Sequence, residues 1–568
     1  MEVDLIIKNA RVYNAYFKRF LHRDVAILGN KFFHISSAGS MELTSKKVLD
    51  AKGKYIVPGL IDIHMHIESS MTTPMEFAKA VVAQGVTTVV ADPHEIANVF
   101  GLEGIEAMLD IKCDHIIDIF YGIPSSVPST SFALETSGGS IDSMEVERLL
   151  ERQNIVCLGE VMNFKDLVEN KHSKINNIIS VIKDKRPELL IEGHCPKISG
   201  LELSRYIYSG VDGDHTHQTV ESLQEKIEKG MFMEIQEKSM TKENLEYLME
   251  NNLYEHFAFV TDDVMADSLR EGHLNRLVKK AVNLGMSPEM AVYAATYTPA
   301  MRMKLRDRGS IAPGKIADFL IIDDIDNFNI LAVYKNGIEA SNDHDSTCSG
   351  ETFPKHFYES VKIGSLNASD FMVKAPKAQG QVDCRIMKVQ SSSTFTEEVQ
   401  ADLNISDGYL NWQDSEYCLI GIFERHGINN NRAYGLVGGE VIKKGAVATT
   451  YSHDSHNLLV MGKNSEDMTL ASNWVIEHNG GICVVHQGKI LAALELPVAG
   501  ILSEEPINIL GGKLKEVREA LRTLGYKHNN EIMSLSTLSL PVSPALKISD
   551  KGLIRVKEQK IVSLFCEI

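Results

Sequence analysis

Apolar and polar residues alternate in short runs at both flanks of the chain, with the period of two that is typical of half-buried strands. These runs occupy residues 5–12, 24–27, 47–50, 314–322 and 330–337. A piece of only two or three strands is marginally stable in water. We therefore expect the flanks, residues 1–57 and 305–345, to pack together as one small β-domain, with the segment between them as an insertion.

The central segment, residues 58–304, alternates short apolar runs with stretches of helical period. Eight candidate strands can be counted: 61–66, 87–93, 115–124, 154–161, 189–195, 210–216, 231–236 and 257–263. Between them apolar residues recur every three to four positions, as in 75–84 and 175–185. Eight alternating strand and helix units over about 245 residues predict an α/β fold, a (β/α)8 barrel.

Beyond residue 345 the chain is rich in short strands with some helix. The polar stretch 341–351 is typical of a linker. We interpret residues 346–568 as a separate α+β domain. Within the central segment, the roughly thirty residues between strands three and four are too many for a plain connection and predict a functional loop.

The chain of 568 residues is acidic: 76 Asp and Glu against 58 Lys and Arg give a formal net charge of −18. It has no long Lys/Arg cluster, so we expect a small-molecule substrate and no nucleic-acid partner. The beginning of the chain resembles no secretory leader, and no uncharged apolar run reaches about 18 residues. We therefore expect a cytoplasmic protein without a membrane partner.

The eight cysteines, among them Cys348, form no C-x-x-C pair, which argues against a disulfide framework and a zinc finger.

Two histidines, His64 and His66, lie where the first central strand is expected to end. Residues two apart in a strand point to the same side, so both imidazoles can bind one metal ion. Four further strand ends carry strong metal ligands: Glu160, His194, His215 with His217, and Asp262 with Asp263. Because active sites of such barrels form at the carboxyl ends of the strands, we expect these side chains to converge.

Four or five imidazoles and two carboxylates are more ligands than one tetrahedral ion needs. The pattern predicts a centre of two divalent metal ions, with Glu160 as the candidate bridging ligand. Ligands of this kind suit Mn, Fe(II) or Zn. Such ions make bound water acidic enough to supply hydroxide near neutral pH, so hydrolysis is the predicted reaction class. Asp262 is the candidate to ligate metal and accept the proton of the attacking water, whereas Asp263 either contacts substrate or caps a helix.

Two stretches, 57–66 (VPGLIDIHMH) and 309–319, resemble the amidohydrolase superfamily. More narrowly, five blocks together resemble the bacterial adenine deaminase family: 66–71, 92–101, 159–164, 192–196 and 261–264. The resemblance extends over the whole chain. It implies a metal-dependent (β/α)8 barrel, a β-sandwich built from both chain ends, and an additional C-terminal domain.

What this resemblance implies is hydrolytic deamination of adenine to hypoxanthine and ammonia, at a centre of two ions of iron or manganese. The ligands carried over position by position are His64, His66, Glu160, His194, His215 and Asp262. His217, two residues beyond His215, stays open as an alternative ligand. The Thr-Asp-Asp ending is also similar to adenosine deaminase, which supports Asp263 as a substrate contact. Ser70 and His94, within two of the blocks, are further candidates for substrate binding.

Four charged groups near the predicted site have two interpretations each. Glu68 and Glu237 are candidates to move protons between the water, the ring and the leaving amine, or they are solvated loop charges. His94 and Glu95 line the pocket or bind an additional ion, or they cap a helix and support the metal ligands.

The C-terminal domain contributes a polar block that contains His453 and His456. These residues form a lid or supply a metal ligand, or they lie in a surface loop. For the whole chain, the alternatives are another metal-dependent amidohydrolase acting on a cyclic amide or N-acyl substrate, and a non-catalytic binding protein on the same fold. We expect a homo-oligomer, a dimer or larger.

Overall fold

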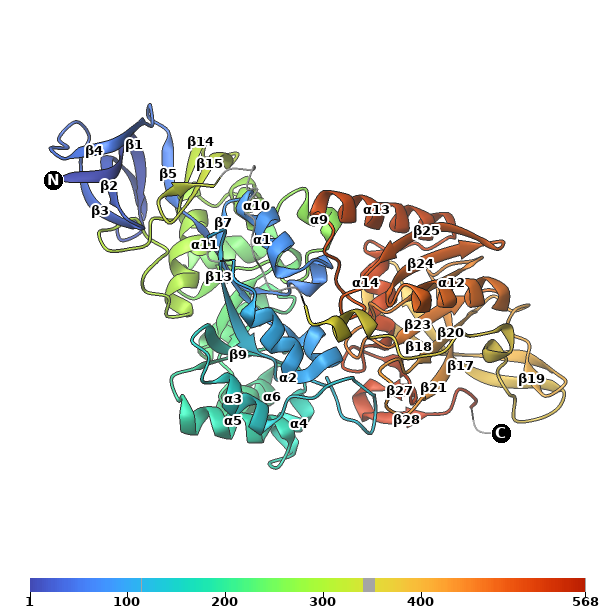
Figure 1. The fold of residues 1–568 in the computed structure, drawn as a ribbon. Helices are drawn as coiled ribbons and strands as arrows, with labels where there is room; N and C mark the ends of the chain where they lie inside the picture. Colours follow the sequence, from blue (N-terminus) through green and yellow to red (C-terminus); the bar gives the residue numbers. More distant parts are fainter. Residues whose placement is uncertain (114, 341–352, 567–568) are drawn as a thin grey trace.

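The computed structural model describes residues 1–113, 115–340 and 353–566. Figure 1 shows a β-rich part at one end of the molecule, a central part of strands and helices, and a strand-rich C-terminal part at the other end. The predicted linker 341–351 and Cys348 lie outside the described residues. Within the described ranges, no helix combines the length and the apolar character needed to span a membrane.

An eight-stranded sheet joins the two flanks of the central segment. From the first flank it takes β1 (Glu2–Asn14), β2 (Arg19–Leu28), β3 (Lys31–Ser37), β4 (Thr44–Asp50) and β5 (Tyr55–Pro58). From the second it takes β14 (Phe319–Asp324), β15 (Asn329–Lys335) and β16 (Ile338–Glu339). The strand order is β16-β15-β14-β5-β1-β2-β3, with β4 paired to β1, so the antiparallel pair of β5 and β14 connects the flanks. Its core contains Ile7, Ile56 and Phe319.

The central part contains two parallel sheets. The first has the order β10-β9-β8-β7-β6 and consists of β6 (Leu60–Met65), β7 (Val86–Ala91), β8 (Asp118–Ile123), β9 (Ile155–Val161) and β10 (Leu190–Gly193). The second consists of β11 (Gly213–Asp214), β12 (Phe232–Ile235) and β13 (Phe257–Phe259). A parallel bridge between Met65 and Asp262 joins the end of β6 to the segment after β13.

A strand overlaps each of the eight predicted ranges, but several strands are shorter than expected. The predicted strand 257–263 ends at Phe259, and Asp262 has a φ of 61°, a left-handed conformation in which a strand cannot continue. The helices of this part are α1 (Pro74–Val82), α2 (His94–Asp110), α3 (Ser143–Leu149), α4 (Phe164–Glu169), α5 (Lys174–Lys185), α6 (Gly200–Tyr208), α7 (Val220–Glu228), α8 (Lys242–Glu250), α9 (Ala266–Leu269), α10 (Leu274–Asn283) and α11 (Pro288–Arg302).

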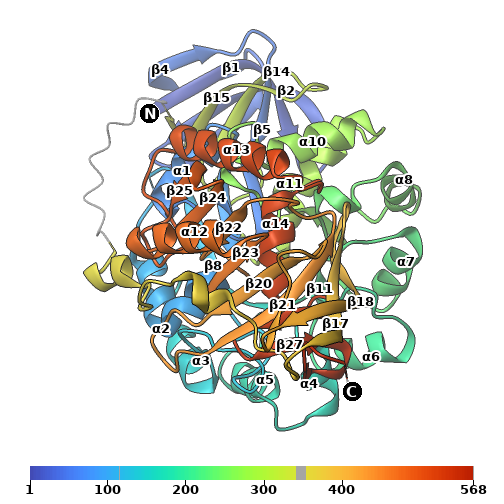
Figure 2. The ribbon, with the colours of Figure 1, turned by 90° about the vertical axis from the view of Figure 1, so that its right-hand side faces the viewer.

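The C-terminal part, residues 353–566, contains a nine-stranded sheet in the order β19-β18-β17-β21-β20-β23-β22-β24-β25. Its strands are β17 (Gly380–Gln390), β18 (Ser393–Ser406), β19 (Tyr409–Leu410), β20 (Cys418–Phe423), β21 (Arg432–Gly439), β22 (Ala446–Thr449), β23 (Leu458–Gly462), β24 (Gly481–His486) and β25 (Lys489–Glu495). A small sheet follows: β26 (Leu546–Ser549), β27 (Gly552–Arg555) and β28 (Lys560–Val562). Helices α12 (Ser465–Glu477) and α13 (Ile507–Thr523) lie over the large sheet (Figure 2), and α14 (Glu531–Ser536) follows them.

The central and C-terminal parts share one hydrophobic core and several buried polar contacts. The predicted functional loop, between β8 and α3, provides several of these contacts. The backbone N–H and the hydroxyl of Thr136 both donate to the carboxylate of Asp550, at 2.8 and 2.7 Å. The Asn457 amide donates to the Thr136 carbonyl at 2.8 Å. The loop is therefore fixed by the C-terminal part.

Candidate metal centre

His64 and His66 lie at the end of β6 with both imidazoles buried and their ring centroids 5.3 Å apart. The Nε2 of His66 is 3.8 Å from Oε1 of Glu160 and 3.6 Å from Oδ1 of Asp262. The Nε2 of His64 is 4.0 Å from the same Asp262 oxygen. The predicted spacing of two therefore brings both rings to the same carboxylates.

Glu160, near the end of β9, lies between two groups of histidines. Its Oε1 faces His66, and its Oε2 is 2.8 Å from Nδ1 of His194 and 3.3 Å from Nε2 of His215. The His215 ring also stacks on His64, with centroids 3.8 Å apart. The two oxygens of this one carboxylate therefore face different histidines.

Sets of three ligand atoms, all within 4.8 Å of one another, overlap at this place. They are His64, His215 and Asp262; His64, His66 and Glu160; Glu160, His194 and His215; His66, Asp262 and Asp263; and Asp92, His94 and Glu160. Among the described residues, Nε2 of His64 and Nδ1 of His215 are buried without a hydrogen-bond partner. Buried imidazole nitrogens without a partner are unfavourable unless they bind something, and this donor set of nitrogen and carboxylate oxygen fits divalent metal ions.

Burial and the close neighbours shift the pKa values of these groups in opposite directions. Burial, reinforced by the neighbouring histidines, lowers the pKa of His64 to about 3. Burial likewise lowers the pKa of His215 to about 4. For Glu160, burial opposes ionisation, but His194, His215 and His66 outweigh it, and the pKa of the carboxyl lies well below its usual range. His64, His215 and Glu160 are thus in the forms that bind metal, whereas, against the opposing effect of burial, the neighbouring acids raise the pKa of His66 to about 9 and also raise that of His194.

Asp92 follows β7 and supports two of these groups. Its carbonyl accepts a hydrogen bond from Nδ1 of His66 at 3.0 Å, and its carboxylate accepts one from the backbone N–H of Glu160 at 2.9 Å. A proton held on Nδ1 leaves Nε2 of His66 with the lone pair that a metal needs. Glu234, in β12, is fully buried with its Oε2 3.8 Å from Nδ1 of His64. Sequence reasoning missed the supporting role of Asp92 and the presence of Glu234 beside His64, although an acid inside the apolar run 231–235 was a signal for Glu234.

The two aspartates after β13 face different partners. The backbone N–H of Asp262 donates to the His64 carbonyl at 3.1 Å, which places its carboxylate beside both histidines of β6. Asp263 accepts a hydrogen bond from the Ser69 hydroxyl at 2.5 Å. Asp263 does not cap a helix, since α9 begins at Ala266 after Met265. Ser69 was not among the predicted residues.

Other predicted residues lie outside this cluster. Glu237 has a half-exposed side chain that pairs with Arg276 and Lys280, at 3.6 and 3.7 Å. His217 is exposed, so the structure brings His215 to the cluster and leaves His217 at the surface.

Two residues of the short 3-10 helix η1 (Glu68–Ser70) differ in what they contact. The Ser70 hydroxyl donates to the Ile67 carbonyl at 2.5 Å and lies 2.7 Å from that of Thr72, so it holds a local turn. Glu68 is fully buried, and burial together with Glu95 raises its pKa to about 7. A carboxyl with that pKa can exchange a proton near neutral pH.

Glu95 connects the central part with the C-terminal part. Its Oε1 is 2.6 Å from Nε2 of His453, and its Oε2 pairs with Nε2 of His456. His94, at the beginning of α2, has Nε2 3.7 Å from Glu95 and Nδ1 3.9 Å from Glu160. His453 and His456 are both buried, so the interpretation of their block as a surface loop was wrong.

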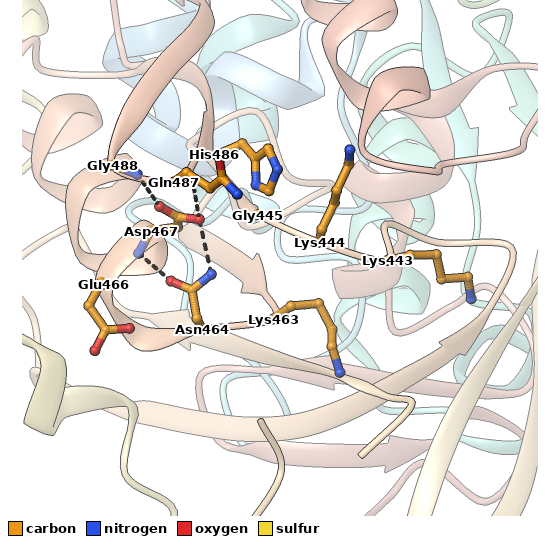
Figure 3. Close-up of a pocket in the computed structure, with 10 residues that line it drawn as sticks. All are labelled: Lys443, Lys444, Gly445, Lys463, Asn464, Glu466, Asp467, His486, Gln487 and Gly488. Carbon is orange, nitrogen blue, oxygen red and sulfur yellow. Dashed lines mark hydrogen bonds between the residues drawn. The ribbon is translucent and has the colours of Figure 1, made fainter. Parts of the chain in front are cut away.

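A separate pocket of about 400 Å³ lies in the C-terminal part, near the beginning of α12 (Figure 3). Asp467 accepts hydrogen bonds there from the backbone N–H groups of Gln487 and Gly488 at 3.0 and 2.8 Å. The Asp467 carboxylate thus satisfies these donors. None of the residues that line this pocket belongs to the metal-ligand cluster.

Known proteins resemble this chain over its whole length. The amidohydrolase family matches residues 55–339, and a family described as adenine deaminase C-terminal domain matches residues 393–560. An adenine deaminase of Clostridium perfringens is 59% identical over 572 residues, covering 100% of both chains. An adenine deaminase 2 of Shouchella clausii is 51% identical, covering 100% of this chain and 99% of the relative. An adenine deaminase of Thermosipho melanesiensis is 36% identical, covering 100% and 97%.

Proposed function

Because the chain belongs to the adenine deaminase family of amidohydrolases, we propose that it hydrolyses adenine to hypoxanthine and ammonia. The observation that carries the proposal is the meeting of four imidazoles and two carboxylates from five strand ends, with Glu160 between His66 on one side and His194 and His215 on the other. The relatives' names favour adenine over the cyclic amide and N-acyl substrates that sequence reasoning left open.

We infer that the two parallel sheets of the central part form one eight-stranded barrel. The bridge between Met65 and Asp262 and the proximity of β10 to β11 support this arrangement. In a barrel of parallel strands the carboxyl ends share one rim, which accounts for ligands that are up to about 200 residues apart in the sequence.

The proposed ligands of two divalent ions are His64, His66, Glu160, His194, His215 and Asp262. This donor set fits Mn, Fe(II) and Zn alike, and we propose Mn or Fe(II) because the resemblance to the adenine deaminase family implies them. When bound, such ions lower the pKa of water enough to supply hydroxide near neutral pH. Glu160 would lie between the two groups of ligands, with His66 on one side and His194 and His215 on the other.

The carboxylates of this chain carry the protons in the proposed reaction. Attack at C6 of adenine and collapse of the adduct to a carbonyl release both protons of the water, and the ring nitrogen and the departing amine each gain one of them. Asp262 is placed to accept the first proton because it lies beside both histidines of β6. Glu68, with its raised pKa, is the candidate to pass a proton onward, and Asp263 is the candidate substrate contact. Glu237 has no part in the proposal because it pairs with Arg276 and Lys280.

The test is deamination of adenine by the chain purified with manganese, followed as ammonia release and as the shift of the purine ultraviolet band. We expect turnover that is lost after chelation and restored by added metal. Asp262→Asn should lower turnover at least about 100-fold, because Asp262 is both the proposed proton acceptor and a proposed metal ligand. Asp323→Asn, at the end of β14, is the matched control. Turnover that survives both chelation and Asp262→Asn would contradict the proposal.

Assembly, cell compartment and domain limits stay predictions. We propose that the partner is a free purine base, that the enzyme works in the cytoplasm as a dimer or larger homo-oligomer, and that its domains are residues 1–57 with 305–345, 58–304 and 346–568. Light scattering measures the oligomeric state directly, and a monomer would contradict the proposed dimer or larger assembly.

A further inference from the structure

The loop between β22 and β23, residues 450–457, brings a group of buried polar side chains from the C-terminal part to the candidate metal centre. Tyr451, His453 and His456 are each no more than 5% exposed. Both histidines contact the carboxylate of Glu95 of α2, so the loop is anchored on the central part by buried polar contacts. A loop that is anchored and buried in this way has a defined position relative to the metal ligands.

Tyr451 has a buried hydroxyl that lacks a well-formed hydrogen bond within the described part of the chain. Burial, reinforced by Glu95, Asp263 and Glu68, raises the pKa of this phenol well above its usual range, and the nearby Ser69 side chain opposes the shift. The hydroxyl therefore lies close to Ser69, which itself donates to Asp263. A protonated phenol is a strong donor, and burying it without an acceptor is unfavourable.

The surroundings of this hydroxyl match the chemistry of a purine base. An adenine ring offers nitrogen lone pairs as acceptors and N–H groups as donors along its edges. Asp263 is an acceptor for an N–H group, and Tyr451 beside it is a donor for a lone pair. Carboxylates and the Ser69 hydroxyl lie around the phenol, but among the described residues none of them forms a hydrogen bond of normal geometry with it. Its donor is therefore left for an external acceptor.

We propose that Tyr451 is a substrate-contacting residue whose hydroxyl donates a hydrogen bond to a ring nitrogen of the purine, so that the C-terminal part supplies one wall of the active site. This inference rests on the proposed function. His453 and His456 are positioning residues in it: through Glu95 they hold the loop that carries Tyr451.

The test compares Tyr451→Phe, which removes one oxygen and keeps the ring, with Tyr526→Phe. Tyr526 is another buried tyrosine of the C-terminal part, whose hydroxyl lies 3.0 Å from that of Ser534. We expect Tyr451→Phe to raise both the KM for adenine and the Kd for hypoxanthine, measured by calorimetry, about tenfold, the size of one lost hydrogen bond. Metal content and melting temperature should stay at wild-type values, and Tyr526→Phe should leave KM and Kd unchanged.

Two outcomes would overturn the assignment in distinguishable ways. If the wild-type chain deaminates adenine and Tyr451→Phe keeps the wild-type KM and Kd, the contact is wrong while the proposed function stands. If the wild-type chain neither deaminates adenine nor binds hypoxanthine, the proposed function is wrong and the contact with it.

Discussion

The contact of Glu95 with His453 and His456 is the most direct test of how the C-terminal part is held on the central part. Glu95→Gln keeps the shape of the side chain and removes its charge. His453 is then left buried without its counter-charge, because Glu95 is what raises the pKa of this imidazole to about 9 against the opposing effect of burial. Breaking a buried charged pair by removing one partner costs about 3–5 kcal/mol.

Glu237→Gln is the matched control, since it removes the same charge from a half-exposed pair with Arg276 and Lys280. Exposed pairs contribute no more than about 1 kcal/mol. The assay is urea unfolding followed by tryptophan fluorescence, which reports on the C-terminal part because Trp412 and Trp474, the two tryptophans of the chain, both lie there. The free energy is taken from the first transition, since a chain of several parts need not unfold in one step. Equal stability of Glu95→Gln and Glu237→Gln would refute the reasoning.

Three further outcomes are expected. The pKa of His453 rises from 6.5 to about 9 on folding, so the stability that its protonation contributes is complete below pH 6.5 and is lost as the pH rises through 9. Urea midpoints of the wild type should therefore fall over that interval, and those of Glu95→Gln should fall less. Asp92→Asn should lower metal affinity about 10- to 100-fold, measured by competition with a chelator, because its carboxylate supports Glu160; unchanged affinity would contradict that role. Lys226→Met breaks a buried pair with Asp214 at 2.7 Å and should cost about 3 kcal/mol in urea unfolding, whereas a loss below about 1 kcal/mol would show that the pair adds little.

The ligand cluster could be predicted because it depends on local rules. His64 and His66 are two apart in a strand, and Glu160, His194 and His215 occur at or just after the ends of other strands, where parallel topology brings side chains together. The same rules failed where the backbone leaves the regular geometry. The strand predicted to continue to Asp263 ends at Phe259, and Asp262 has a left-handed conformation.

Contacts between distant segments could not be predicted from the sequence. Glu95 and His456 are 361 residues apart, and no local pattern relates an acid at the beginning of α2 to a histidine in a loop of the C-terminal part. The contact of Ser69 with Asp263 was not predicted, for a different reason. In the tight turn of η1, adjacent hydroxyls point to different partners, Asp263 for the first and the Ile67 carbonyl for the second.

The hydrogen bonds between Thr136 and Asp550 join residues that are 414 positions apart. During synthesis a chain leaves the ribosome from its N-terminus, and its segments begin to fold in that order. The loop that contains Thr136 emerges long before its acceptor does, so it cannot take its final position until nearly all of the described chain has been translated. Slow translation of the last third of the message would thus prolong the time during which this surface is open to proteases and chaperones.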